Sequence, residues 1–143
     1  MDVILCSFSS NTAHYADQFI RGMRDGGATA TVHRFHDHRA FHPELSGDAL
    51  VICFPVYGWK PPWPLELYLL RRLPKGRGKP AFILYTCAGG PENAGIYAKL
   101  LLSLRGYRAI GRNWAVYPLN IATLRLGPSR LWKFLDRLLP KIG

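Results

Sequence analysis

The sequence predicts an α/β domain with a doubly wound, five-stranded parallel sheet of strand order 2-1-3-4-5 and helices on both faces. Two observations lead to this prediction. Continuous apolar runs, typical of strands buried on both faces, alternate along the chain with apolar residues at helical spacing. Such alternation requires a parallel sheet covered by helices, and five strands in 143 residues suit this strand order. Because there is no internal repeat or linker, we expect one domain over residues 1–143.

Five apolar runs give the expected strands. The second run alternates with polar residues, as an edge strand does, and the others are mostly continuous. The runs are VILC (3–6), TATVHRF (29–35), ALVICF (49–54), AFILY (81–85) and WAVY (114–117).

Apolar stripes between and after these runs predict four helices, which end at glycine or proline. The segment 36–48 offers only a weak fifth helix. The stripes are Ala13, Ala16, Ile20 and Met23; Leu65, Leu69, Leu70 and Leu73; Ile96, Leu100, Leu101 and Leu104; and Leu131, Phe134, Leu135, Leu138 and Leu139.

Composition limits the class of protein. Apolar residues make up 48% of the chain, which is enough for a packed core, and no run approaches the ~20 residues of a membrane span. The first residues do not resemble a signal peptide, so we expect a cytoplasmic protein. Cys6, Cys53 and Cys87 form no C-x-x-C pair, and we expect free, mostly buried thiols rather than a disulfide or a metal site.

In such sheets, ligands bind beyond the carboxyl ends of the strands where the strand order reverses. The first loop at this edge, SFSSNT (7–12), offers hydroxyl and amide groups before a helix N-terminus, where a phosphomonoester would bind without a lysine. By themselves these residues favour helix capping, and that alternative stays open. A cysteine phosphatase is excluded, because Thr12 stands where its arginine should follow Cys6.

The second loop, PVYGWKPPWP (55–64), holds Tyr57, Trp59 and Trp63 on a backbone stiffened by prolines. A flat aromatic ligand would stack there, and Gly58 would let the backbone approach it. The alternative is an apolar lid or a protein-binding patch.

The third loop, TCAGGPENAG (86–95), has adjacent glycines at a strand end, which permit close approach to a ligand edge. Glu92 or Asn93 could instead simply begin the next helix.

In this order and spacing, SFSSNT, FPVYGWKPP, TCAGG and YPLN (117–120) resemble the flavodoxin-like domain of the EFR-type ferrodoxin family. The resemblance covers nearly the whole chain and implies FMN as cofactor. It implies an electron-transfer protein or a small flavin-dependent reductase. From the residues themselves we predict no catalytic side chain and no metal ligand, because none stands out as an acid–base catalyst and the Cys and His spacing suits no metal site. The implied cofactor-binding residues are Ser7, Phe8, Ser9, Ser10, Asn11 and Thr12 on the phosphate, and Pro55, Val56, Tyr57, Gly58, Trp59, Thr86, Cys87, Ala88, Gly89 and Gly90 around the ring.

Two departures from the family pattern stand out. Phe8 and Ser10 occupy positions where the family usually has glycine, so we expect strain of about 1 kcal/mol at Ser10. The chain also has no C-x-x-C-x-x-C motif, and three cysteines cannot build an iron–sulfur cluster. The alternative function is a flavodoxin-like binding or regulatory module that has lost the cofactor.

The charge is strongly positive, with 19 Lys and Arg against 9 Asp and Glu. We expect this surface to steer an acidic redox partner of the ferredoxin or flavin reductase type and, near a flavin, to raise its potential. Nucleic acid is less favoured, because no binding motif accompanies the charge. The basic residues gather in two groups: Arg71, Arg72, Lys75, Arg77 and Lys79, and Arg125, Arg130, Lys133, Arg137 and Lys141.

The histidines are concentrated in HRFHDHRAFH (33–42), with Asp37 among them. Their irregular spacing after an edge strand favours a solvated loop over a transition-metal site.

Overall fold

The computed structural model describes residues 1–8, 10–90 and 93–117. The helix expected at 131–139, the second basic group and residues 118–120 lie outside this part of the chain. The described residues form five strands and three helices: β1 (Asp2–Cys6), α1 (Ser10–Asp25), β2 (Thr31–Phe35), β3 (Leu50–Pro55), α2 (Trp63–Arg71), β4 (Pro80–Cys87), α3 (Ala94–Leu104) and β5 (Arg108–Val116).

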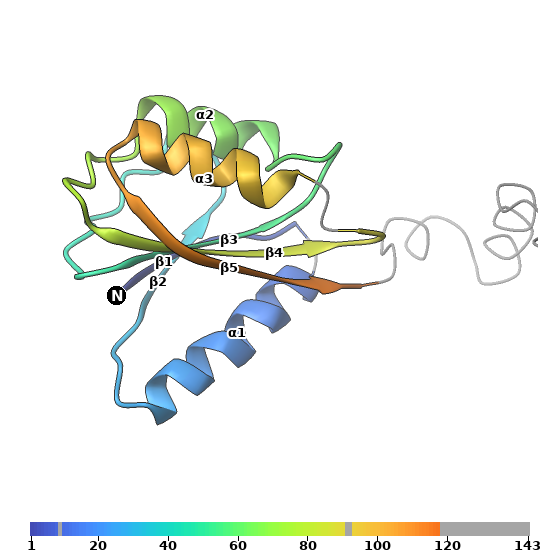
Figure 1. The fold of residues 1–143 in the computed structure, drawn as a ribbon, viewed down its shortest axis with the longest axis horizontal. Coiled ribbons are helices and arrows are strands. Elements are labelled where there is room, and N and C mark those ends of the chain that lie inside the picture. Colours follow the sequence, from blue (N-terminus) through green and yellow to red (C-terminus); the bar gives the residue numbers. More distant parts are fainter. Residues whose placement is uncertain (9, 91–92, 118–143) are drawn as a thin grey trace, which may run out of the picture.

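The sheet has the predicted topology. Its strand order is β2-β1-β3-β4-β5, and every neighbouring pair is parallel. Helix α1 covers one face, whereas α2 and α3 lie side by side on the other (Figure 1). The doubly wound fold class is therefore confirmed for the described residues.

Side chains of the central strands point alternately to two cores, as the period of a strand requires. Ile4 and Ile52 belong to the larger core under α2 and α3. Leu5 and Cys53 belong to the smaller core under α1. Because both faces of β1 and β3 are buried, their sequences are apolar throughout.

The helices are where predicted, but three stripe assignments need correction. Met23 of α1 and Leu70 of α2 are each 37% exposed. The last residues that these two helices bury are Ile20 and Leu69. In α3 three of the four predicted stripe residues face solvent: Ile96, Leu100 and Leu104 are all more than half exposed, and of the stripe only Leu101 is buried.

Helix α3 is turned in this way because it packs on the sheet through small residues. Ala94, Gly95 and Ala98 are buried, together with Leu101 and Leu102. A Cβ atom on Gly95 would lie 2.7 Å from the hydroxyl oxygen of Tyr85, so only glycine allows this close approach.

Two further segments differ from the prediction. The last strand begins at Arg108, six residues before the apolar run at 114–117, and lies at the edge of the sheet, where most of its side chains are exposed. The segment 36–48 forms neither helix nor strand. Phe41 nevertheless anchors it, with ring centroids 5.0 Å from those of Phe35 and Tyr68.

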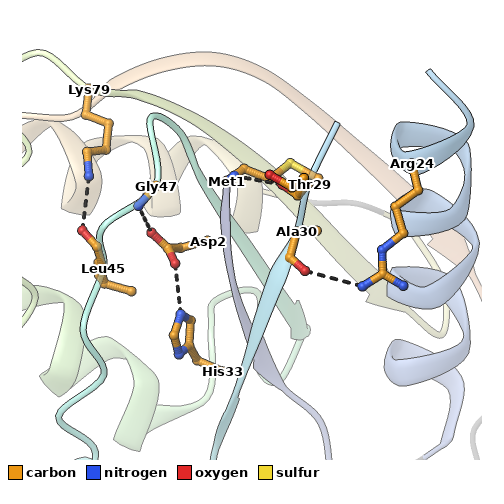
Figure 2. Close-up of polar contacts among 9 residues, drawn as sticks. All are labelled: Met1, Asp2, Arg24, Thr29, Ala30, His33, Leu45, Gly47 and Lys79. Carbon is orange, nitrogen blue, oxygen red and sulfur yellow. Dashed lines mark hydrogen bonds and ion pairs between the residues drawn. The ribbon is translucent and has the colours of Figure 1, made fainter. Parts of the chain in front are cut away.

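The amino edge of the sheet is fastened by hydrogen bonds to buried Asp2 (Figure 2). Its Oδ1 lies 2.9 Å from Nε2 of His33, and its Oδ2 accepts a 2.7 Å bond from the Gly47 amide. His33 is therefore a half-buried partner on β2, and its assignment to a solvated loop was wrong. Among the residues described, no group of three or more His, Cys, Asp or Glu could hold a metal ion.

Within the same part of the chain, no helix has the length and apolar character needed to cross a membrane.

Candidate functional site

Three loops meet at the carboxyl edge of the sheet, where β1, β3 and β4 end (Figure 1). The hydroxyl oxygens of Thr12 and Thr86 lie 2.7 Å apart and join the first loop to the third. The Val56 amide donates a 2.8 Å bond to the Thr86 carbonyl, which joins the second to the third. The rings of Phe8 and Tyr57 stack at 6.3 Å. The predicted site residues that are described thus belong to one place.

The first loop leads directly into α1. Ser10 is the first helical residue, and the first turn of α1 contains no acidic side chain. Backbone N–H groups and the positive end of the helix dipole therefore face this loop without a competing carboxylate. Ser9 lies outside the described residues.

The strain expected at Ser10 is absent. Among the described residues, only Trp59 and Arg77 combine a side chain with a positive φ, so neither Phe8 nor Ser10 needs the conformation that favours glycine. The expectation was wrong because Ser10 adopts the right-handed helical backbone of α1, which does not require glycine.

Thr12 has a different setting from that expected of a phosphate contact. Its side chain is 1% exposed, and its hydroxyl faces that of Thr86, which is also buried. This pair ties the start of α1 to the end of β4 and holds the first loop in register with the third.

The second loop contains a two-residue hairpin. The Tyr57 amide donates to the Lys60 carbonyl at 3.0 Å, and the Lys60 amide donates back at 3.4 Å. Gly58 and Trp59 between them have φ angles of 57° and 65°, as in a type I′ turn. Tryptophan at a positive φ costs about 1–2 kcal/mol. The two hydrogen bonds of the hairpin offset this strain and keep Trp59 at the tip, where it is 69% exposed.

An ion pair fastens this hairpin to the helices. Lys60 Nζ lies 3.0 Å from Oε2 of Glu66, and the Tyr97 hydroxyl donates a 2.5 Å bond to Oε1 of the same carboxylate. The bond to Glu66 is the main cause that raises the pKa of Tyr97 above its usual value. The second loop is thereby linked to α2 and to α3.

Sequence analysis missed Lys60, Glu66 and Tyr97. A signal was present, because Glu66 is the single acidic residue between positions 49 and 91 and stands among leucines. A carboxylate in that setting is expected to be buried with a partner.

The second and third loops enclose a hollow of about 220 Å³. A Cβ atom built on Gly58 or Gly89 would have no neighbour within 4 Å, so space is open beside both backbones. Asn93 occupies the position before α3 but makes no capping bond with its side chain. The hollow is lined by Val56, Gly58, Trp59, Cys87, Ala88, Gly89 and Gly90.

All three cysteines are buried thiols that take part in no disulfide, as predicted. Burial raises the pKa of the Cys6 thiol to about 12 and raises that of Cys53 as well. A thiol that stays protonated is no nucleophile, which agrees with the exclusion of a cysteine phosphatase.

The first basic group does not lie at this edge. Residues 72–79 connect the end of α2 to the start of β4, so they lie at the amino edge of the parallel sheet (Figure 1). The six residues of β3 alone span about 20 Å, well beyond the screening length of about 8–10 Å in physiological salt. At that separation this group contributes little to the electrostatic field at the carboxyl edge.

Comparison with known proteins establishes the fold and nothing finer. No family model and no curated protein matches the sequence, but solved structures match it well.

Three such structures illustrate the likeness. A Megasphaera elsdenii flavodoxin has a TM-score of 0.66 at 21% identity, over 80% of this chain and 85% of its own. A flavodoxin from the domain Archaea has a TM-score of 0.64 at 17% identity, over 93% and 98%. A flavoprotein in complex with FMN from Lactobacillus acidophilus has a TM-score of 0.61 at 14% identity, over 79% and 91%. The chain has the flavodoxin-like fold.

Proposed function

We propose that this chain binds FMN and serves as an electron-transfer protein or a small flavin-dependent reductase. The observation that carries the proposal is the meeting of three loops at one sheet edge, with an open hollow between the exposed Trp59 ring and the glycine backbone of the third loop. That arrangement suits a flat ring with a phosphate tail.

The residues of the first loop fit the phosphate. Ser7, Ser10 and Asn11 bring small polar side chains to the N-terminus of α1. A dianion is stabilised there by backbone N–H groups and the helix dipole, and no acidic side chain of the first turn opposes it. A phosphate at this end would thus be held without any lysine.

The residues of the second and third loops fit the ring. Tyr57 and Trp59 are 40% and 69% exposed and offer aromatic faces, while Gly58, Gly89 and Gly90 leave room for a ring edge. Backbone groups beside these glycines would hydrogen-bond the polar edge of the ring.

When bound, FMN supplies reversible transfer of one or two electrons. The chain's own residues hold and orient it. The Thr12–Thr86 pair and the Lys60–Glu66 ion pair fix the loops relative to one another, so that little ordering is required on binding. Trp59 lines one side of the hollow, and its ring would cover a bound flavin from that side.

Several likenesses support this reading. The fold is that of flavodoxins, and one structural neighbour is a complex with FMN. The quoted motifs further suggest the EFR-type ferrodoxin family, an acidic redox partner and a cytoplasmic location as parts of the proposal. The alternative of a module without cofactor drew on the substitutions at Phe8 and Ser10, and neither residue has the positive φ that would require glycine.

The test is a titration of the cofactor-free protein with FMN, followed by quenching of flavin fluorescence. We expect saturation at one FMN per chain, with a yellow protein. Riboflavin, which lacks the phosphate, should bind at least about tenfold more weakly, since charge-assisted bonds of roughly 1.5–3 kcal/mol are lost. A colourless protein that leaves FMN fluorescence unchanged would refute the proposal and favour the module without cofactor.

A further inference from the structure

Helix α3 carries an exposed apolar stripe beside the edge strand β5. Ile96, Leu100 and Leu104 follow one another at every fourth position and are 54%, 53% and 58% exposed. Ile110 of β5 is 61% exposed. Single exposed leucines are ordinary, but side chains at this spacing share one helix face, and an apolar face left exposed is typical of an interaction surface. We call these four residues the α3–β5 stripe.

A hollow of about 340 Å³ opens between α3 and β5 within the stripe. Ile83 and Ala109 contribute to its apolar lining, and Lys99 and Arg112 also line it. Ile96 of α3 and Gly111 of β5 complete the described lining together with Ile110. A hollow of this kind receives an anchoring side chain in many protein interfaces.

The charge around the stripe has one sign. Residues 94–117 contain Lys99, Arg105, Arg108 and Arg112 and no Asp or Glu. An isologous contact with a second copy would bring these cations together, which is unfavourable. The chain's own residues 118–143 are basic as well, with five Lys or Arg against one Asp. Charge complementarity therefore favours an acidic occupant.

The stripe also continues toward the candidate site. Trp114 and Val116 of β5 are 41% and 58% exposed, and Val116 pairs with Cys87 of the third loop. Helix α3 itself begins four residues after Gly90. A protein that covers the stripe would thus lie next to the hollow between the second and third loops.

We propose that the α3–β5 stripe is the docking surface for an acidic redox protein that presents an apolar side chain surrounded by carboxylates. The redox character of the partner rests on the proposed function, whereas the position and chemistry of the surface do not. Lys99 and Arg112 pair with its carboxylates, and its apolar side chain enters the hollow beside Ile110.

The test uses an acidic [2Fe–2S] ferredoxin as the probe and the full chain without FMN, so that a failure of flavin binding does not affect the result. Amide signals of the ¹⁵N-labelled chain are followed by NMR at low salt. We expect shifts concentrated in residues 94–117, with a dissociation constant that rises steeply with salt. Absence of binding, or shifts centred elsewhere, would overturn the proposal.

Matched charge reversals locate the interaction. The double variant Lys99→Glu/Arg112→Glu should weaken binding at least about tenfold. The variant Arg71→Glu/Lys75→Glu changes the net charge equally at the amino edge of the sheet, and we expect less than about a twofold effect there. Equal losses of affinity in the two variants would show that binding depends only on the net charge of the chain, and would contradict a defined docking surface.

Leu100→Ser tests the apolar part and the rival occupants. We expect about tenfold weaker binding with a shift in Tm below about 3 °C, because the residue is exposed in the free chain. A much larger fall in Tm would show that residues 118–143 cover the stripe. A dimer in sedimentation equilibrium that this variant dissociates would assign the surface to a second copy. Either result would overturn the proposal.

Discussion

The two edges of the sheet are built from the same strands but differ in how their polar groups and aromatic side chains are placed. At the amino edge, both carboxylate oxygens of the buried Asp2 have partners within 3 Å, and the N-terminal ammonium donates a 2.8 Å bond to the Thr29 carbonyl (Figure 2). At the carboxyl edge, aromatic rings are exposed, a tryptophan has a positive φ and a hollow opens beside glycines.

This contrast separates the contacts that stabilise the sheet from those that could bind a ligand. Satisfied buried polar groups fasten the amino edge, where nothing need bind. Exposed rings at the carboxyl edge cost stability and persist where a ligand can use them, whereas backbone strain occurs at both edges, at Trp59 and at Arg77. Mutations at the first edge should therefore alter unfolding, and mutations at the second should alter binding.

The largest effect is expected from Asp2→Ala. The substitution removes the acceptor of the Gly47 amide and the partner of His33, so the free energy of unfolding should fall by about 2–3 kcal/mol. Urea unfolding measures this loss. The affinity for FMN should stay within about twofold, because the site is at the other end of β1. Asp2→Asn keeps one acceptor and should lose less; a loss below about 0.5 kcal/mol in Asp2→Ala would contradict the contrast between the edges.

An intermediate effect is expected from Trp59→Gly, with opposite signs for stability and binding. Glycine adopts the φ of 65° without strain, so the free energy of unfolding should rise by about 0.5–1 kcal/mol. Loss of the stacking ring should weaken FMN binding about tenfold.

Trp59→Ala is the matched control for this variant. It removes the same ring but retains a Cβ at positive φ, so its affinity should fall equally without the gain in stability. If Trp59→Gly is no more stable than Trp59→Ala, the strain is absent; if affinity is unchanged in both, Trp59 is outside the site.

The smallest effect is expected from Glu66→Gln. The variant loses the ion pair with Lys60, which is 46% exposed, so stability should fall by less than about 1 kcal/mol. FMN affinity should fall only a few-fold, as the hairpin loosens. The pKa of Tyr97 should move down toward its ordinary value, because the carboxylate that raised it is gone. NMR titration of the tyrosine ring carbons checks this shift, and an unchanged Tyr97 pKa would argue against the link between the second loop and α3.

Much of the fold could be predicted because it depends on local patterns. The continuous apolar runs at 3–6 and 49–54 indicated central strands, and α1 ends just before the Gly26-Gly27 pair. The three loops were located from the strand order alone, since parallel strands bring their carboxyl ends to one edge. The buried face of α3 could not be predicted, because consecutive leucines at positions 100, 101 and 102 point to different sides of the helix. The close packing of Gly95 against Tyr85 decides which of these leucines are buried.

The amino-acid sequence by itself determined the order of strands and helices and the three loops that meet at the sheet edge, since both follow from apolar periodicity and chain order. Only the tertiary structure decided that Thr12 bonds to Thr86, that Glu66 holds Lys60 and Tyr97, and that His33 bonds to Asp2. Each of these contacts joins residues that the fold brings together from separate segments. It also decided that the basic residues at 71–79 lie at the edge opposite the site, because a helix that crosses a sheet carries its two ends to opposite edges.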